Sequence, residues 1–151
     1  MARMTENRVM QSGVVPFRLT TDGVEILLIT SRKTGAWILP KGHLEPFMSA
    51  WDSAAKEAME EAGAVGDIIV TPVGSAAYRK RGLLHQVTYY PMAVEQLMAT
   101  WPEFGSRRRK WHRLDKAPSR VADPALRRLL ATLPEIFQLQ GITETVTAAT
   151  A

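Results

Sequence analysis

The chain has 151 residues, of which 46% are hydrophobic, so it is long and apolar enough for one domain with a single core. It has no cysteine, which excludes disulfide bonds, thiolate metal sites and a cysteine nucleophile. Its formal net charge is +4, and it has neither an apolar signal segment nor a run of about 18 apolar residues, so we expect a cytoplasmic protein without a membrane span.

A series of short apolar and β-branched segments, separated by turn residues, predicts a sheet. Strands are expected at residues 9–19, 24–30, 37–39, 68–77, 83–96 and 108–114. Asp22 and Gly23 predict a hairpin turn between the first two strands. Pro16 lies within the first segment, and because proline cannot donate to a ladder it predicts an edge strand or a bulge.

Two segments have helical character. Residues 50–62 keep apolar side chains at spacings of three and four, with Ser49 as a candidate N-cap and Gly63 at the C-terminal end. A second helix is expected from residue 124, and Pro134 predicts that it is interrupted there.

The order of these elements predicts the α/β class, with a mixed β-sheet sandwiched between helices (α/β/α). We expect one domain over residues 8–140. Residues 1–7 are predicted to be a flexible arm, and residues 141–151, which lack a core pattern, a mobile tail.

Three carboxylates share one face of the first predicted helix. Glu57, Glu60 and Glu61 are spaced i, i+3 and i+4, which repel one another and oppose the helix dipole near its C-terminus. A helix that tolerates both costs is suited to hold a hard divalent cation such as Mg²⁺. For this pattern alone, a solvated glutamate-rich face is the alternative.

The stretch Gly42–Ala64 resembles the Nudix box, whose pattern is G-x5-E-x7-R-E-U-x-E-E-x-G-U with U an aliphatic residue. The spacing matches throughout, and the conserved-type positions fall on Gly42, Glu57, Glu60, Glu61 and Gly63. The sequence departs from the pattern in three respects: Met48 replaces the usual loop glutamate, Lys56 replaces the usual arginine, and Ala58 and Ala64 are smaller than the usual aliphatic residues. In the family the loop glutamate and the arginine mainly hold the loop and the helix together, so their replacement concerns support of the site and leaves the helix glutamates intact.

The resemblance implies the Nudix fold and hydrolysis of a phosphoanhydride bond by water, assisted by Mg²⁺ or Mn²⁺. It implies that Glu57, Glu60 and Glu61 are catalytic and bind the metal, with the carbonyl of Gly42 as a further ligand. Some members add a glutamate from a later segment, for which Glu95 and Glu103 are the candidates. The alternative for each of these two is a surface carboxylate.

The run TGAWILPKGHLEP is similar to the loop of Nudix enzymes that act on diphosphoinositol polyphosphates or diadenosine polyphosphates. We therefore expect a phosphorylated small-molecule substrate, contacted by Arg32, Lys33, Lys41 and His43. The basic turn at residues 79–81 could add further phosphate contacts. A homodimer is compatible with the sequence.

Two other functions remain open. Met48 and Lys56 would suit a degenerate Nudix domain that binds a nucleotide or polyphosphate as a sensor, although such a module would not need all three helix glutamates. The basic run 107–110 beside Trp111 would suit an RNA-end-processing protein. Nothing resembles a dedicated RNA-binding motif, so we do not expect nucleic acid as the partner and we rank the hydrolase first.

Overall fold

The computed structural model describes residues 7–144. Residues 1–6 and 145–151, which hold most of the predicted arm and tail, lie outside the described residues. The strands are β1 Arg8–Thr20, β2 Gly23–Thr30, β3 Trp37–Ile38, β4 Lys41–His43, β5 Ala64–Ile68, β6 Gly74–Lys80, β7 Leu83–Leu97 and β8 Arg109–Arg113. The helices are α1 Ala50–Ala62, α2 Ala117–Arg120 and α3 Pro124–Leu139.

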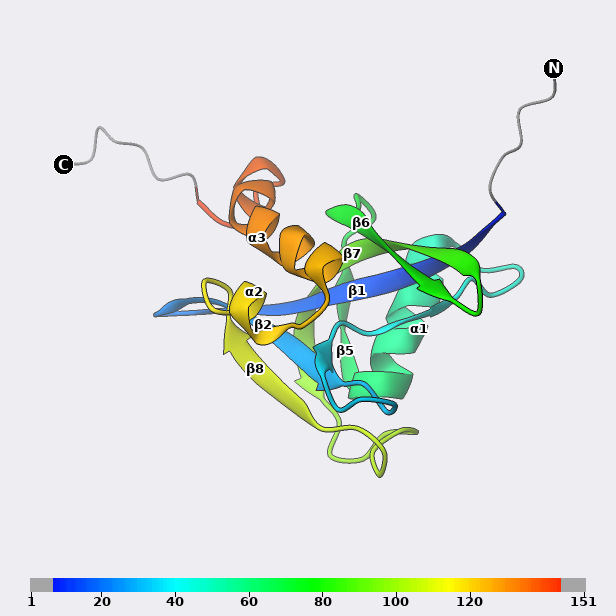
Figure 1. Ribbon diagram of the computed structural model, residues 1–151. Helices are drawn as coiled ribbons and strands as arrows, with labels where there is room; N and C mark the ends of the chain where they lie inside the picture. The colour runs from blue at the N-terminus through cyan, green and yellow to red at the C-terminus, as the bar shows by residue number, and fades with distance from the viewer. Residues whose placement is uncertain (1–6, 145–151) are drawn as a thin grey trace, which may run out of the picture.

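The strands form one mixed eight-stranded sheet with β1 at its centre. β1 is antiparallel to β2 and β4 and parallel to β7. β7 in turn pairs with β5 and β6, and β2 pairs with β3 and β8. Figure 1 shows β1 passing between α3 and α1.

Both faces of the sheet are buried. Alternate side chains of each strand point to opposite faces, so neighbouring residues belong to different core clusters. Val15 and Leu28 pack with α3 in one core cluster, whereas Val14 and Leu27 pack with α1 in the other. The predicted sheet between helices is confirmed.

The position of Pro16 was predicted wrongly. β1 is an interior strand, in which pairing with β4 ends at Gly13 and pairing with β2 begins at Phe17. The N–H of Val14 donates to Pro40 O on the β4 side, so the nitrogen of Pro16, two residues later, faces the gap between the two partners. No ladder hydrogen bond is needed there, which is why an interior strand accepts proline.

Two further boundaries differ from the prediction. The strand expected at 68–77 is two strands, β5 and β6, with Pro72 between them. α3 continues through Pro134 without interruption, because Leu133 and Phe137 on either side of it are fully buried. After α3, Ile142 N–H donates to Phe137 O at 2.8 Å, which folds the first residues after the helix back against it.

No helix within residues 7–144 is long and apolar enough to cross a membrane.

Candidate functional site

The orientation of α1 follows from its caps and its apolar stripe. Ser49 Oγ accepts the N–H of Asp52 at 3.1 Å, and Gly63 ends the helix in the left-handed conformation, as the sequence predicts. The fully buried residues Ala54, Ala58 and Ala62 lie against the sheet. Because that stripe is fixed, the neighbouring glutamate face is directed to one side of the sheet.

Beside this face the structure has an open cleft of about 570 Å³. Its acidic lining consists of Glu45, Glu57, Glu61 and Glu103. Its basic lining consists of Arg32, Lys33, Lys41, Arg79, Lys80 and Arg107. Gly42 and His43 also line it, so of the predicted site residues the structure brings all but Glu60 and the additional candidate Glu95 to one cleft.

Glu57 lies directly against the backbone of Gly42. A Cβ atom on Gly42 would overlap the Glu57 carboxylate, which would then have to move from its place. Burial, followed by the negative charges of Glu61 and Glu60, raises the pKa of Glu57 to about 7. Glu57 is therefore a partly buried carboxylate beside Gly42, and a bound cation would stabilise its charged form.

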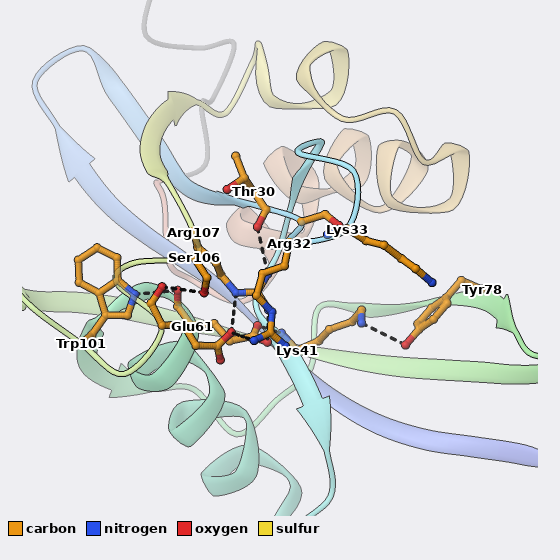
Figure 2. A network of polar contacts seen from close by, with 11 residues as sticks. Thr30, Arg32, Lys33, Lys41, Glu61, Tyr78, Trp101, Ser106 and Arg107 are labelled. Atoms are coloured by element: carbon orange, nitrogen blue, oxygen red, sulfur yellow. Dashed lines mark hydrogen bonds and ion pairs between the residues drawn. The ribbon is translucent and has the colours of Figure 1, made fainter.

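Glu61 is buried and has one partner on each carboxylate oxygen. Its Oε1 accepts the backbone N–H of Lys41 at 3.0 Å, and its Oε2 pairs with Arg107 Nη2 at 3.0 Å (Figure 2). Burial raises the pKa of Glu61, while Arg107 and the Lys41 N–H act in the opposite direction. The two contacts fix the carboxylate at the rim of the cleft.

Arg107 is the main residue that sequence reasoning missed. The sequence placed it in a basic run that would suit an RNA-end-processing protein, yet its side chain is only 7% exposed. It donates to Glu61, to Glu103 Oε1 at 2.9 Å and to Thr30 O at 3.0 Å. Glu103 lies four residues before Arg107 in the sequence, and this spacing of opposite charges was the available sign that the two side chains pair.

The two additional glutamate candidates have different locations. Glu103 lies in the cleft, where it is bound by Arg107 and lies 3.3 Å from Arg32 Nη1. Glu95 is exposed and lies beside Asp67, whose carboxyl hydrogen-bonds to it and raises its pKa. Glu103 is therefore the candidate that geometry favours.

Glu60 points to a different partner. Lys56 Nζ lies 2.8 Å from Glu60 Oε1 and 3.1 Å from Glu45 Oε1, and these two hydrogen bonds raise the pKa of Lys56. Glu45 N–H also donates to Ser53 Oγ of α1 at 3.0 Å. Met48 is 41% exposed. The loop is thus attached to α1 through Glu45, which lies three residues before position 48, where the box pattern has its loop glutamate.

The remaining predicted contacts lie opposite the helix. Lys41 Nζ donates to Tyr78 OH at 3.1 Å (Figure 2), whereas Arg32, Lys33 and His43 are exposed at the cleft. These side chains line the same cleft as the glutamates.

Arg109 of the basic run points inward as well, whereas Arg108 and Lys110 are exposed. Arg109 donates to Ala62 O at 2.9 Å and to Met98 O at 2.8 Å, and its guanidinium lies 4.0 Å from the Trp101 ring centroid. Trp101 Nε1 donates to Glu61 O at 3.0 Å. Arg109 and Trp101 therefore satisfy carbonyls at the C-terminal end of α1.

The cleft contains candidate metal ligands, although their side chains do not converge on one position. Within residues 7–144, no group of three or more His, Asp or Glu side chains is arranged so that it could hold a metal ion as it stands. Glu57, Glu61 and Glu103 nevertheless line one cleft with Gly42, and burial raises the pKa values of Glu57 and Glu61. All are oxygen donors, which fits Mg²⁺ or Mn²⁺.

The fold is that of an α/β domain. Its cleft is lined both by carboxylates and by basic side chains, a combination that suits a phosphorylated ligand. The model of the NUDIX domain matches residues 10–133. Nudix hydrolase 18, mitochondrial, of Arabidopsis thaliana is 30% identical over 149 residues, which cover 93% of this chain and 84% of that protein. Diphosphoinositol polyphosphate phosphohydrolase 3-beta of Homo sapiens is 27% identical over 103 residues, covering 67% of this chain and 62% of that protein.

A solved structure agrees with the fold. The crystal structure of C. elegans Ap4A hydrolase has a TM-score of 0.71 and 22% identity, covering 85% of this chain and 98% of that chain. With the domain match over most of its length, the chain belongs to the Nudix hydrolase family.

Proposed function

We propose that this protein hydrolyses a phosphoanhydride bond in a polyphosphorylated small molecule of the diadenosine polyphosphate or diphosphoinositol polyphosphate type. The observation that carries the proposal is the cleft, which is lined both by the carboxylates of Glu57, Glu61 and Glu103 and by a group of basic side chains. The human relative is named a diphosphoinositol polyphosphate phosphohydrolase and the C. elegans structure an Ap4A hydrolase, and these two names support this substrate class.

The acidic side of the cleft would carry the reaction. Glu57 and Glu61 would hold Mg²⁺ or Mn²⁺, with the carbonyl of Gly42 as a further ligand and Glu103 as the carboxylate from outside α1. The cation, when bound, neutralises charge on the phosphate oxygens and lowers the pKa of water. Glu60 would share the cation or accept a proton from the attacking water.

The basic side would bind the substrate. Arg32 and Lys33 come from the turn after β2, Lys41 comes from β4, and Arg79 and Lys80 come from β6. Lysine and arginine both pair well with phosphate, so several of them around one opening favour a ligand with many phosphate groups. His43 lies beside them and would contact a phosphate.

The test is turnover of a substrate panel with Mg²⁺ and then Mn²⁺. It contains diadenosine polyphosphates, diphosphoinositol polyphosphates, nucleotide sugars, ADP-ribose and nucleoside triphosphates. We expect one of the first two classes to be hydrolysed, Glu61→Gln to abolish turnover, and Glu95→Gln, an exposed carboxylate outside the cleft, to leave it unchanged. Equal turnover by the Glu61→Gln variant would contradict the proposal.

The sensor function is the second candidate, and the exposed Met48 is the observation that favours it. Metal-dependent binding of a panel member without turnover would support it. The RNA-processing alternative has less support, because Arg107 and Arg109 are bound to carboxylates and carbonyls of the chain itself.

A further inference from the structure

A short polar chain crosses the basic side of the cleft. Lys41 Nζ donates to Tyr78 OH at 3.1 Å, and Tyr78 OH donates to Gln11 Oε1 at 2.7 Å. Lysine has only donors, so the hydroxyl oxygen accepts from Lys41 and its single proton is left for Gln11. The direction of both hydrogen bonds is therefore fixed by the chemistry of the groups.

The Tyr78 ring itself is held in place. It stacks on His85 with a centroid separation of 4.9 Å and an interplanar angle of 21°. His85 and Gln11 are both buried, at 8% and 6% exposure. Tyr78 lies on β6, and its side chain reaches across β7 so that the hydroxyl meets Gln11 of β1.

Lys41 is linked to the acidic side through its backbone. Its N–H donates to Glu61 Oε1 at 3.0 Å, while its ammonium lies 4.5 Å from the Tyr78 ring centroid. A lysine side chain has four rotatable bonds, so a free Lys41 would sample many positions in the cleft. The contact with Tyr78 restricts the ammonium to one region while leaving donors for a phosphate.

We propose that Tyr78 is a positioning residue for substrate binding: it holds the Lys41 ammonium at a fixed place opposite the glutamates, where that ammonium meets a phosphate group of the substrate. This inference rests on the proposed function, since it assigns the phosphate contact to the same cleft. Tyr78 acts through Lys41 and belongs to binding, so its loss raises KM and leaves kcat nearly unchanged.

The test is a double-mutant cycle of Tyr78→Phe and Lys41→Met. Tyr78→Phe keeps the ring and its stacking on His85 but removes the hydroxyl. We expect it to raise KM for the hydrolysed polyphosphate by about 3- to 10-fold. In the Lys41→Met background, the same change is expected to have no further effect. Equal effects of Tyr78→Phe in both backgrounds, or a fall in kcat at unchanged KM, would overturn the inference.

A binding measurement separates this inference from the proposed reaction. Titration of inorganic tripolyphosphate in the presence of Mg²⁺ needs no turnover, and the same dependence of the Tyr78 effect on Lys41 is expected there. Tyr90→Phe is the control, since Tyr90 is buried against Trp51 outside the cleft lining. Absence of tripolyphosphate binding by the parent protein, or an equal loss in the Tyr90→Phe variant, would also overturn it.

Discussion

Lys56 and Glu45 are joined by a 3.1 Å contact that connects the loop before α1 to the helix. The same ammonium lies 2.8 Å from Glu60 Oε1, so Lys56 bridges two carboxylates. The box pattern has an arginine at position 56 and a glutamate at position 48. Lysine cannot form the bidentate fork of arginine, but it can reach two single partners. The two departures from the pattern are thus linked: Glu45 replaces the contact that Met48 cannot make.

Removing this bridge should change the pH dependence of activity. Lys56 lowers the pKa of Glu57, whose value is about 7. Lys56→Met should therefore raise the pKa of Glu57 further, shift the acidic limb of the kcat/KM profile to higher pH and reduce kcat/KM by about 3- to 10-fold at neutral pH. Lys56→Arg, which keeps the charge, should retain the parent profile. An unshifted limb in the methionine variant would mean that Lys56 has no electrostatic role.

The buried pair of Arg107 and Glu61 should be important for folding as well as for the site. Both side chains are nearly inaccessible, at 7% and 10% exposure, so removing the cation leaves uncompensated buried carboxylates. Arg107→Met should lower the free energy of unfolding by about 3 to 5 kcal/mol, measured by urea denaturation. Arg108→Met removes a neighbouring exposed arginine and should change it by less than about 0.5 kcal/mol. Similar losses in the two variants would contradict the structural assignment of Arg107.

Sequence reasoning predicted the local arrangement of residues that lie close together in the chain. The helix glutamates, the caps Ser49 and Gly63, and the glycine at position 42 follow from local spacing, because one turn of helix or one loop sets their geometry. Most strand positions follow from local apolar patterns in the same way.

The missing parts depend on strand pairing. Tyr78 approaches Lys41 only because β6 and β4 reach the same cleft through β7 and β1. Arg107 meets Glu61 across 46 residues of sequence. The accommodation of Pro16 likewise depends on where β1 exchanges β4 for β2. No local pattern contains such register information.

Stability of the protein without divalent metal should fall as the pH rises. A carboxyl whose folded-state pKa is raised to about 7 binds its proton more tightly in the folded than in the unfolded chain, where its pKa is about 4.3. That stabilisation is present below pH 4.3 and is lost between this value and pH 7. With Glu57 partly solvated, we expect a fall of about 1 to 2 kcal/mol in the free energy of unfolding, measured with a chelator at pH 4.5 and 7.5.

Glu57→Gln removes the titrating group and should reduce this pH dependence. Glu61, whose pKa is also raised, would leave a smaller slope of the same sign. Glu95→Gln changes an exposed carboxyl away from the cleft and is the control. If the Glu57→Gln variant and the parent protein show the same dependence on pH, the raised pKa of Glu57 is refuted.

The close approach of Gly42 to Glu57 gives a steric test of the site. Gly42 does not need a left-handed backbone, so Gly42→Ala changes only the space beside the Glu57 carboxylate, which the added methyl group would displace. A displacement of about 1 Å at a catalytic group can cost about 100-fold in rate, and we expect a kcat/KM loss of that order together with weaker Mn²⁺ binding. Gly105→Ala is a matched control, because a Cβ there meets nothing within 4 Å and its backbone is not left-handed. Equal Mn²⁺ affinity in the two alanine variants would show that the contact between Gly42 and Glu57 does not set the geometry of the metal ligands.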